Sequence, residues 1–347
     1  MKISPLVLHH DRKTTLAGLR EAFDAEPACP PKISFRQYSN LSDEDRELYD
    51  QAREDFLRLT LRVKTREQTV CARILEDLIR INPRLKNSRR GLMISAPMFS
   101  GKTELALLLA RSVERKHAAL HPDYLRDGDV PVVWVEMTEH STGKALLAQI
   151  VEFLAPTIVL PKQIATDRLR KLAVEALQRH RTKLLVIDEA HKLGGTEPSS
   201  VIKALQNESC ASVVLVGINL DQAFNAGDGL QVSARCEFVT LDKIDPIVKD
   251  DLDQWIKWVA TFDNFLPLCG HSYGLLTRNA GTLLHAANGQ LAVLAMIVDR
   301  LVASILRDES RTSEIVTRER LFGVLDSLRR TTLNKHSVTL DDLVDAA

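Results

Sequence analysis

The chain has 347 residues, of which 45% are hydrophobic, and this length and composition allow about two globular domains with well buried cores. They exclude a fibrous or largely disordered protein. The 46 basic side chains balance the 46 acidic ones, so any contact with nucleic acid must come from local clusters of charge rather than from net charge.

Cysteine usage and the N-terminal segment indicate where the protein works. The five cysteines are scattered, without a C-x-x-C pair, which is typical of free thiols in a reducing compartment. Residues 1–13 lack the apolar core of a signal peptide. We therefore expect a cytoplasmic protein with no membrane partner.

The first ninety residues divide into two segments. Residues 1–50 contain several prolines and a polar stretch, which predicts an extended arm with little core of its own. Residues 51–90 show a helical pattern that Pro83 ends. Its apolar stripe consists of Val70, Ile74, Leu78 and Ile81, with Cys71 and Leu75 beside it.

A local excess of positive charge lies between Arg58 and Arg90, where ten Lys and Arg residues accompany three Asp and Glu residues. The excess is either a surface that contacts the phosphates of double-stranded DNA or a solvated helix face balanced by acids elsewhere. The segment has no aromatic residues for base stacking, so a DNA contact here would be non-specific.

A short apolar strand, a tight loop and a helix follow one another from Gly91 to Ala110. The loop ends in Gly101-Lys102-Thr103, as a phosphate-binding loop of the form G-x-x-x-x-G-K-[ST] does, although Ala96 replaces the first glycine. Backbone N–H groups would cradle the β-phosphate of ATP, Lys102 would reach the β- and γ-phosphates, and the Thr103 hydroxyl would bind Mg²⁺. The predicted ATP-binding residues are Ala96, Pro97, Met98, Phe99, Ser100, Gly101, Lys102, Thr103 and Glu104.

Residues 91–243 alternate apolar runs with helical patterns, which predicts an α/β core with a doubly wound, mostly parallel sheet of five strands. The expected strands are Leu92–Ser95, Val132–Glu136, Leu184–Asp188, Ser212–Gly217 and Glu237–Leu241. Helices should begin near Thr103, Thr142, Thr166, Glu197 and Asp221.

A pair of acids, Asp188-Glu189, directly follows the four apolar residues Leu184 to Ile187. A carboxylate at the C-terminal end of a buried parallel strand lies where open α/β sheets bind ligands. Asp188 would hold Mg²⁺, and Glu189 would polarise the attacking water as general base. The alternative is that the pair merely opens the next helix, because acids favour the first helical turn.

Two further polar residues are candidates for catalysis. Asn219 follows the fourth strand and either orients the lytic water or caps the next helix. Arg235 precedes the fifth strand and either reaches the nucleotide of a neighbouring subunit or forms a surface ion pair.

Residues 244–347 show no β-type alternation, and helical patterns over 246–260, 272–287 and 290–308 predict a C-terminal helical lid and tail. The uncharged stretch 281–298 is near the length of a membrane span, but its polar residues and the turn at Asn288-Gly289 favour two packed helices.

Together the segments APMFSGKT, VPVVWVEM, LLVIDEAHKL, SVVLVGIN and SARCEFVTL, followed by LLHAANGQLAVLAMI, resemble the TniB/TnsC family of transposition ATPases within the AAA+ class. The similarity covers roughly 90–305. It implies an AAA+ fold with a helical lid, ATP and Mg²⁺ binding, and assembly into rings or helical filaments on double-stranded DNA. By the same resemblance, Asn219 matches approximately the sensor position and Arg235 the finger between subunits.

The resemblance further implies a regulator that links a target-selecting partner protein to a transposase. The segment NGQLAVLA lacks the arginine that many AAA+ proteins direct at the γ-phosphate, and with Ala96 this predicts slow hydrolysis. We therefore expect an oligomeric, DNA-associated AAA+ ATPase that regulates DNA transposition. The alternative function is a nucleotide-gated signalling or defence switch that does not bind DNA.

Overall fold

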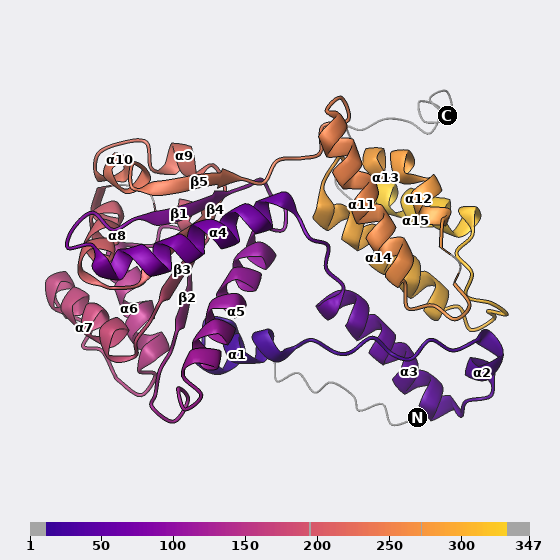
Figure 1. Ribbon diagram of the computed structural model, residues 1–347, viewed down its shortest axis with the longest axis horizontal. Helices are drawn as coiled ribbons and strands as arrows, with labels where there is room; N and C mark the ends of the chain where they lie inside the picture. Colours follow the sequence, from indigo (N-terminus) through magenta and orange to yellow (C-terminus); the bar gives the residue numbers. More distant parts are fainter. Residues whose placement is uncertain (1–11, 194–195, 272, 332–347) are drawn as a thin grey trace. The chain divides into compact units, whose positions relative to one another are not determined.

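Figure 1 presents the protein as a computed structural model that describes residues 12–193, 196–271 and 273–331. The described chain forms two compact units. The sheet unit takes its described residues from 12–24 and 65–242, and the helical unit takes its residues from 25–64 and 243–331. This division departs from the segments expected from sequence, because residues 25–64 group with the C-terminal helices and residues 12–24 group with the sheet.

The sheet unit contains five parallel strands in the order β2-β3-β4-β1-β5. The strands are β1 (Gly91–Ser95), β2 (Val132–Glu136), β3 (Leu184–Asp188), β4 (Ser212–Gly217) and β5 (Cys236–Thr240). Every residue of β1, β3 and β4 is buried, as apolar runs in a parallel sheet covered on both faces require. The predicted doubly wound parallel sheet is confirmed.

Helices cover both faces of this sheet (Figure 1). One face carries α4 (Arg66–Ile81) and α5 (Lys102–Leu120), with α1 (Leu16–Asp24) packed beside α5. The other face carries α6 (Gly143–Leu154), α7 (Thr166–Arg179), α8 (Thr196–Glu208) and α10 (Asp228–Ser233). Short turns complete the unit, namely the 3₁₀ helices η2 (Asn82–Arg84) and η3 (Ala190–Lys192) and the helix α9 (Leu220–Ala223).

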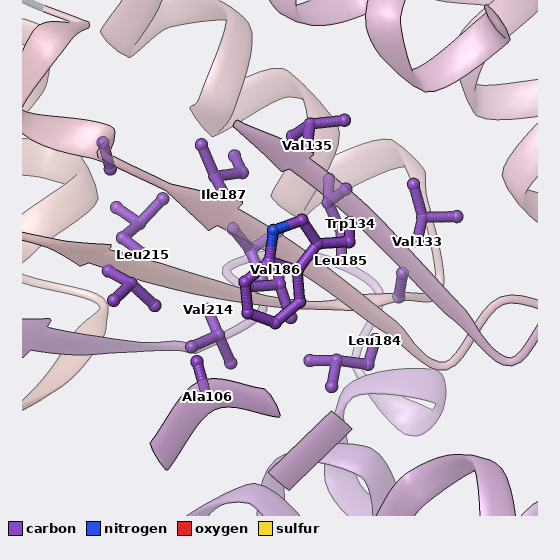
Figure 2. Packing of buried hydrophobic residues seen from close by; sticks show 14 of the residues in the cluster. Ala106, Val133, Trp134, Val135, Leu184, Leu185, Val186, Ile187, Val214 and Leu215 are labelled. Carbon is purple, nitrogen blue, oxygen red and sulfur yellow. The ribbon is translucent and has the colours of Figure 1, made fainter. Parts of the chain in front are cut away.

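Strand register fixes which side chains share a face of the sheet. Trp134 pairs with Val186, and Val186 pairs with Val214, so all three point the same way, toward Ala106 of α5 (Figure 2). Two residues further along, Glu136 pairs with Asp188 on the same face. The alternation of the strands therefore brings both carboxylates to the C-terminal edge of the sheet, on the side of α5.

The helical unit combines two segments that are far apart in sequence. From the first come α2 (Phe35–Ser39), α3 (Asp43–Asp55) and the π-helical turn η1 (Phe56–Thr60). From the second come α11 (Lys249–Phe265), α12 (Leu275–Arg278), α13 (Ala280–Ala287), α14 (Leu291–Leu306) and α15 (Arg318–Thr331). Apolar residues of η1 share one buried cluster with those of α11 and α14, so the two segments pack together within the helical unit.

A buried ion cluster joins the two segments of the helical unit. The Arg53 guanidinium on α3 is fully buried and donates to Glu314 Oε1 over 3.0 Å and to the Pro267 carbonyl over 3.2 Å. Asp50 and Arg311 complete the cluster. Sequence spacing gives no indication of this cluster because its partners lie more than 200 residues apart.

Two expectations for the helices have clear outcomes. On α4 the buried residues are Cys71, Ile74, Leu75 and Leu78, whereas Val70 is 37% exposed, so the buried face is centred one residue from the expected stripe. Asn288, with φ 49°, separates α13 from α14 as predicted. Within the described ranges no single helix is long and apolar enough to cross a membrane, and only α13 and α14 taken together, bent by 114°, match such a span.

Candidate nucleotide and magnesium site

The phosphate-binding loop, residues 96–103, joins the end of β1 to the start of α5. Gly101 is the N-cap of α5 and has a left-handed φ of 83°, a conformation that favours glycine. The first N–H groups of this 19-residue helix therefore face the loop, and together with the helix dipole they suit an anionic phosphate.

Ala96 fits the position where the usual motif has its first glycine. Among the described residues with positive φ, the loop contributes Phe99 and Gly101 but not Ala96. Ala96 is 4% exposed, and its N–H donates to the Gly217 carbonyl over 3.0 Å. The alanine therefore adds no left-handed strain at its own position, and the left-handed non-glycine residue of the loop is Phe99, with φ 58°.

The other predicted loop residues surround the helix N-terminus. The Ser100 hydroxyl donates to the Pro97 carbonyl over 2.8 Å and closes the loop. Met98 is 66% exposed, and Phe99 is 70% exposed. Glu104 lies in the first turn of α5. Contacts of these side chains with ATP stay predictions.

Asp188 and Thr103 meet at the edge of the sheet beside this loop. Asp188 is 1% exposed; its Oδ1 accepts the backbone N–H of Glu189 over 3.0 Å, and its Oδ2 accepts the Thr103 hydroxyl over 3.2 Å. Hydroxyl and carboxylate oxygens are the ligands that Mg²⁺ prefers, and the remaining positions would go to phosphate and water. The donor set therefore fits the predicted magnesium site.

Lys102 and Glu189 lie at the same edge, with Lys102 Nζ 4.0 Å from Glu189 Oε1. Glu189 has a left-handed φ of 56°, which turns the chain away from β3 immediately after Asp188. Lys192 Nζ approaches the other carboxylate oxygen, Oε2, to 3.4 Å. The short helix η3 does follow, but the left-handed conformation of Glu189 differs from a simple helical first turn.

His191 links this edge to the end of β4, and sequence analysis assigned it no role. The N–H of Ile218 donates to His191 Nδ1 over 3.3 Å. Nε2 lies 3.8 Å from Glu189 Oε2. A Cβ added at Gly217 would lie 2.7 Å from Leu220 Cδ2 and 3.1 Å from His191 Nδ1, so this strand end is closely packed. The imidazole thus connects the general-base candidate to the strand that precedes Asn219.

Asn219 and Arg235 occupy different surroundings. Asn219 is the exposed N-cap of α9, with φ 47°, and it caps the helix through its backbone carbonyl, because its side chain makes no capping hydrogen bond. Arg235 lies at the N-terminal ends of the strands, away from the phosphate-binding loop at their C-terminal ends. There its carbonyl accepts the N–H of Gly91. Its Nη1 donates to Asn207 Oδ1 over 2.9 Å. Arg235 therefore does not reach the loop of its own subunit, and both catalytic roles stay predictions.

Two more charged residues border the predicted magnesium site without having been singled out in the sequence. Lys13 Nζ lies 3.1 Å from Asp188 Oδ2 and 3.7 Å from Glu136 Oε2. The sequence could have indicated Glu136, because it ends an apolar run as Asp188 does; the structure then places the two in register. No local pattern could have indicated Lys13, which is 175 residues from Asp188 in sequence.

Three solved structures share the fold. ORC2 of Aeropyrum pernix, in its ADPNP-ADP complexes, has a TM-score of 0.54 at 13% identity, covering 83% of this chain and 72% of that chain. ORC1 of Aeropyrum pernix in complex with DNA has a TM-score of 0.53 at 17% identity, covering 80% and 68%. Cdc6p from Pyrobaculum aerophilum has a TM-score of 0.52 at 16% identity, covering 82% and 71%. At these identities the likeness shows the fold alone, and it confirms the predicted AAA+ architecture.

Comparison with curated proteins gives no match. Residues 62–245 match the family described as Bacterial TniB protein, and this range is more than half of the 347 residues. It contains the phosphate-binding loop, the acid pair, Asn219 and Arg235. The predicted resemblance is therefore confirmed, and the chain belongs to the TniB family.

Proposed function

We propose that the protein is an ATPase that regulates DNA transposition and assembles as an oligomer on double-stranded DNA. The observation that carries the proposal is the meeting of Thr103 and Asp188 beside a helix N-terminus, in a chain of the TniB family. The DNA-bound state of the ORC1 structure supports DNA as a partner for a protein of this fold. A transposase and a target-selecting protein are the further partners we propose.

In the proposed reaction each residue has a distinct task. Lys102 would bind the β- and γ-phosphates as a point charge, and Glu189 would accept a proton from the attacking water. Thr103 and Asp188 would hold Mg²⁺, which when bound neutralises developing charge on the phosphate oxygens. Arg235 would act on the nucleotide of the adjacent subunit, since it lies away from its own loop. Nucleotide binding would then favour the assembled state, and hydrolysis would release it.

Two substitutions test the nucleotide part of the proposal. Lys102→Ala should abolish ATP-dependent assembly, because the phosphates lose their point charge. Glu189→Gln should preserve ATP binding and trap the assembly, because only the proton acceptor is lost. Sedimentation with and without ATP measures both. Assembly of Lys102→Ala with its ATP dependence intact would refute the site assignment.

Two arginines of the basic segment, Arg58 and Arg89, are engaged in contacts within the fold, which leaves fewer candidates for DNA contact. Arg58 forms ion pairs with Glu54 and Asp299 in the helical unit. Arg89 donates to the carbonyls of Asn82, Asn207 and Ser209. These two arginines therefore stabilise the fold. The exposed basic residues of this segment within the sheet unit include Arg73, Lys86 and Arg90.

Replacing these three exposed residues with Gln tests the DNA part. For every phosphate of duplex DNA that the variant no longer neutralises, the slope of log affinity against log salt concentration should become shallower by about 0.9. The matched control replaces Arg168, Lys171 and Arg179 with Gln, because these exposed residues belong to α7 on the other face of the sheet. Binding to random duplex at several salt concentrations distinguishes the variants. Nucleotide binding by the native chain without salt-dependent DNA affinity would favour a nucleotide-gated switch that uses no DNA.

A further inference from the structure

The ammonium group of Lys13 lies at the oxygen that the proposed magnesium site requires. Its Nζ is 3.1 Å from Asp188 Oδ2, the same oxygen that accepts the Thr103 hydroxyl. Glu136 Oε2, from the neighbouring strand, lies 3.7 Å from the ammonium. The ammonium also lies 4.8 Å from the centre of the Trp134 ring, within the range of a cation–π contact. Lys13 is thus held by two carboxylates and one aromatic face.

This placement follows from the anchoring of α1, three residues further along the chain. Leu19 and Phe23 of α1 are buried in the core of the sheet unit. Arg20 donates to Glu114 Oε1 and to the Asp129 carbonyl, each over 3.1 Å. The Lys13 side chain is 27% exposed, well below a freely solvated lysine. The packing of α1 in the sheet unit therefore places Lys13 beside Asp188.

We propose that Lys13 is an internal cation that competes with magnesium-bound nucleotide for Asp188 and so restrains nucleotide binding. The inference rests on the proposed function, because it takes Thr103 and Asp188 as the magnesium ligands. It assigns residues 12–15, directly before α1, a regulatory role: any event that withdraws Lys13 from Asp188 would release the site.

The physical basis is mutual exclusion of two cations at one oxygen. The ammonium and Mg²⁺ repel each other and need the same lone pairs of Asp188 Oδ2. Nucleotide with magnesium can then bind only the fraction of molecules in which Lys13 has moved. The apparent association constant is the intrinsic constant multiplied by that fraction. A lysine that contacted a phosphate would have the opposite effect, because its loss would weaken binding.

Lys13→Met tests the proposal, since it keeps an unbranched apolar stem and removes the charge. We expect the variant to bind ADPNP with Mg²⁺ about three- to tenfold more tightly than the native chain, the range of an ion pair that is partly buried. The gain should vanish when EDTA replaces Mg²⁺. Arg12→Met is the matched control, because Arg12 is the adjacent cation and is exposed. Isothermal calorimetry measures all three proteins.

A second measurement follows the contact with Trp134 directly. The chain contains three tryptophans, so fluorotryptophan labelling gives a simple fluorine NMR spectrum in which Trp134→Phe identifies the signal of residue 134. Adding ADPNP with Mg²⁺ should shift that signal toward its position in the nucleotide-free Lys13→Met protein. Arg20→Gln, which loosens α1 without changing Lys13, should also tighten nucleotide binding.

The outcomes separate this inference from the function on which it rests. Weaker or unchanged binding by Lys13→Met, with normal binding by the native chain, overturns the competition and leaves the ATP site in place. A gain of equal size in EDTA also overturns it, because the competitor would then not be the metal. Failure of the native chain, Arg12→Met and Lys13→Met alike to bind ADPNP overturns the proposed function itself.

Discussion

Thr103 and Asp188 lie 85 residues apart in sequence, yet the hydroxyl of one donates to the carboxylate of the other over 3.2 Å. The first belongs to α5 and the second ends β3, so only the packing of α5 against the sheet brings them together. The contact joins the phosphate-binding loop to the acid pair and is the core of the proposed magnesium site.

The hydroxyl of Thr103 is the feature to test in that contact. Thr103→Val keeps the shape of the side chain and removes the oxygen, so the affinity for ATP with Mg²⁺ should fall about tenfold, the loss of one ligand worth about 1.4 kcal/mol. Thr103→Ser keeps the oxygen and should bind nearly as the native chain does. Calorimetric titration with and without Mg²⁺ measures both, and an equal loss in EDTA would contradict a role for Thr103 in metal binding.

Arg235 should act between subunits. Arg235→Ala should leave ATP binding by a single subunit unchanged and lower the ATPase rate of the assembly about 10³-fold, the contribution typical of an arginine finger. Asn207→Ala is the control, because it removes the partner of Arg235 within the subunit and leaves the guanidinium intact.

Mixing variants makes the prediction for Arg235 specific to the interface. Arg235→Ala subunits keep Glu189, and Glu189→Gln subunits keep Arg235, so a mixture forms some interfaces in which both residues are native. Phosphate release from the mixture should exceed that of either variant alone. Absence of any recovery in mixtures that do assemble would show that Arg235 acts within its own subunit or only on folding.

The buried pair of Arg53 and Glu314 should contribute strongly to the stability of the helical unit. Glu314→Gln removes the fully buried carboxylate beside the Arg53 guanidinium, which keeps only its ion pair with Asp50, and should lower the free energy of unfolding by about 3 kcal/mol. Asp299→Asn removes one of the two partners of the 41% exposed Arg58, which keeps Glu54, and should cost less than about 1 kcal/mol. Urea titration followed by circular dichroism compares the two. Similar costs would show that burial does not set the strength of these pairs.

The same pair predicts how stability depends on pH. Burial raises the pKa of Glu314, but the hydrogen bonds and positive charge of Arg53 outweigh it and hold the pKa below the usual 4.5. The contribution of Glu314 to stability is therefore complete above pH 4.5 and is lost as the pH falls through the lowered pKa. The difference in unfolding free energy between the native chain and Glu314→Gln should shrink at acid pH. A difference that stays constant down to the acid transition would contradict this linkage.

Thiol reactivity checks the burial of the cysteines. Burial raises the pKa of Cys71, Cys236 and Cys269 to about 12, so these thiols should resist alkylation in the folded protein. Cys29 and Cys210 are exposed and should be modified first. Mass spectrometry after brief treatment with iodoacetamide should find two modified sites, and early modification of Cys236 would show that β5 is not in place.

The sequence by itself determined the parts of this protein that depend on local pattern. Apolar runs such as residues 184–187 form buried strands because a parallel sheet covered on both faces excludes water from every position. Gly101-Lys102-Thr103 marks the loop because the motif stands between an apolar strand and a helix in the sequence itself. The family resemblance rests on the same local segments.

The tertiary structure alone decided how distant residues meet. Arg53 and Glu314, 261 residues apart, unite residues 25–64 with the C-terminal helices, because a buried charge needs a counter-charge wherever the fold supplies one. Lys13 reaches Asp188 only because α1 packs beside α5, and His191 reaches Ile218 only because β3 and β4 are neighbours. No repeating pattern in the sequence indicates either contact, because electrostatic and hydrogen-bond partners depend on distance in space and not on spacing along the chain.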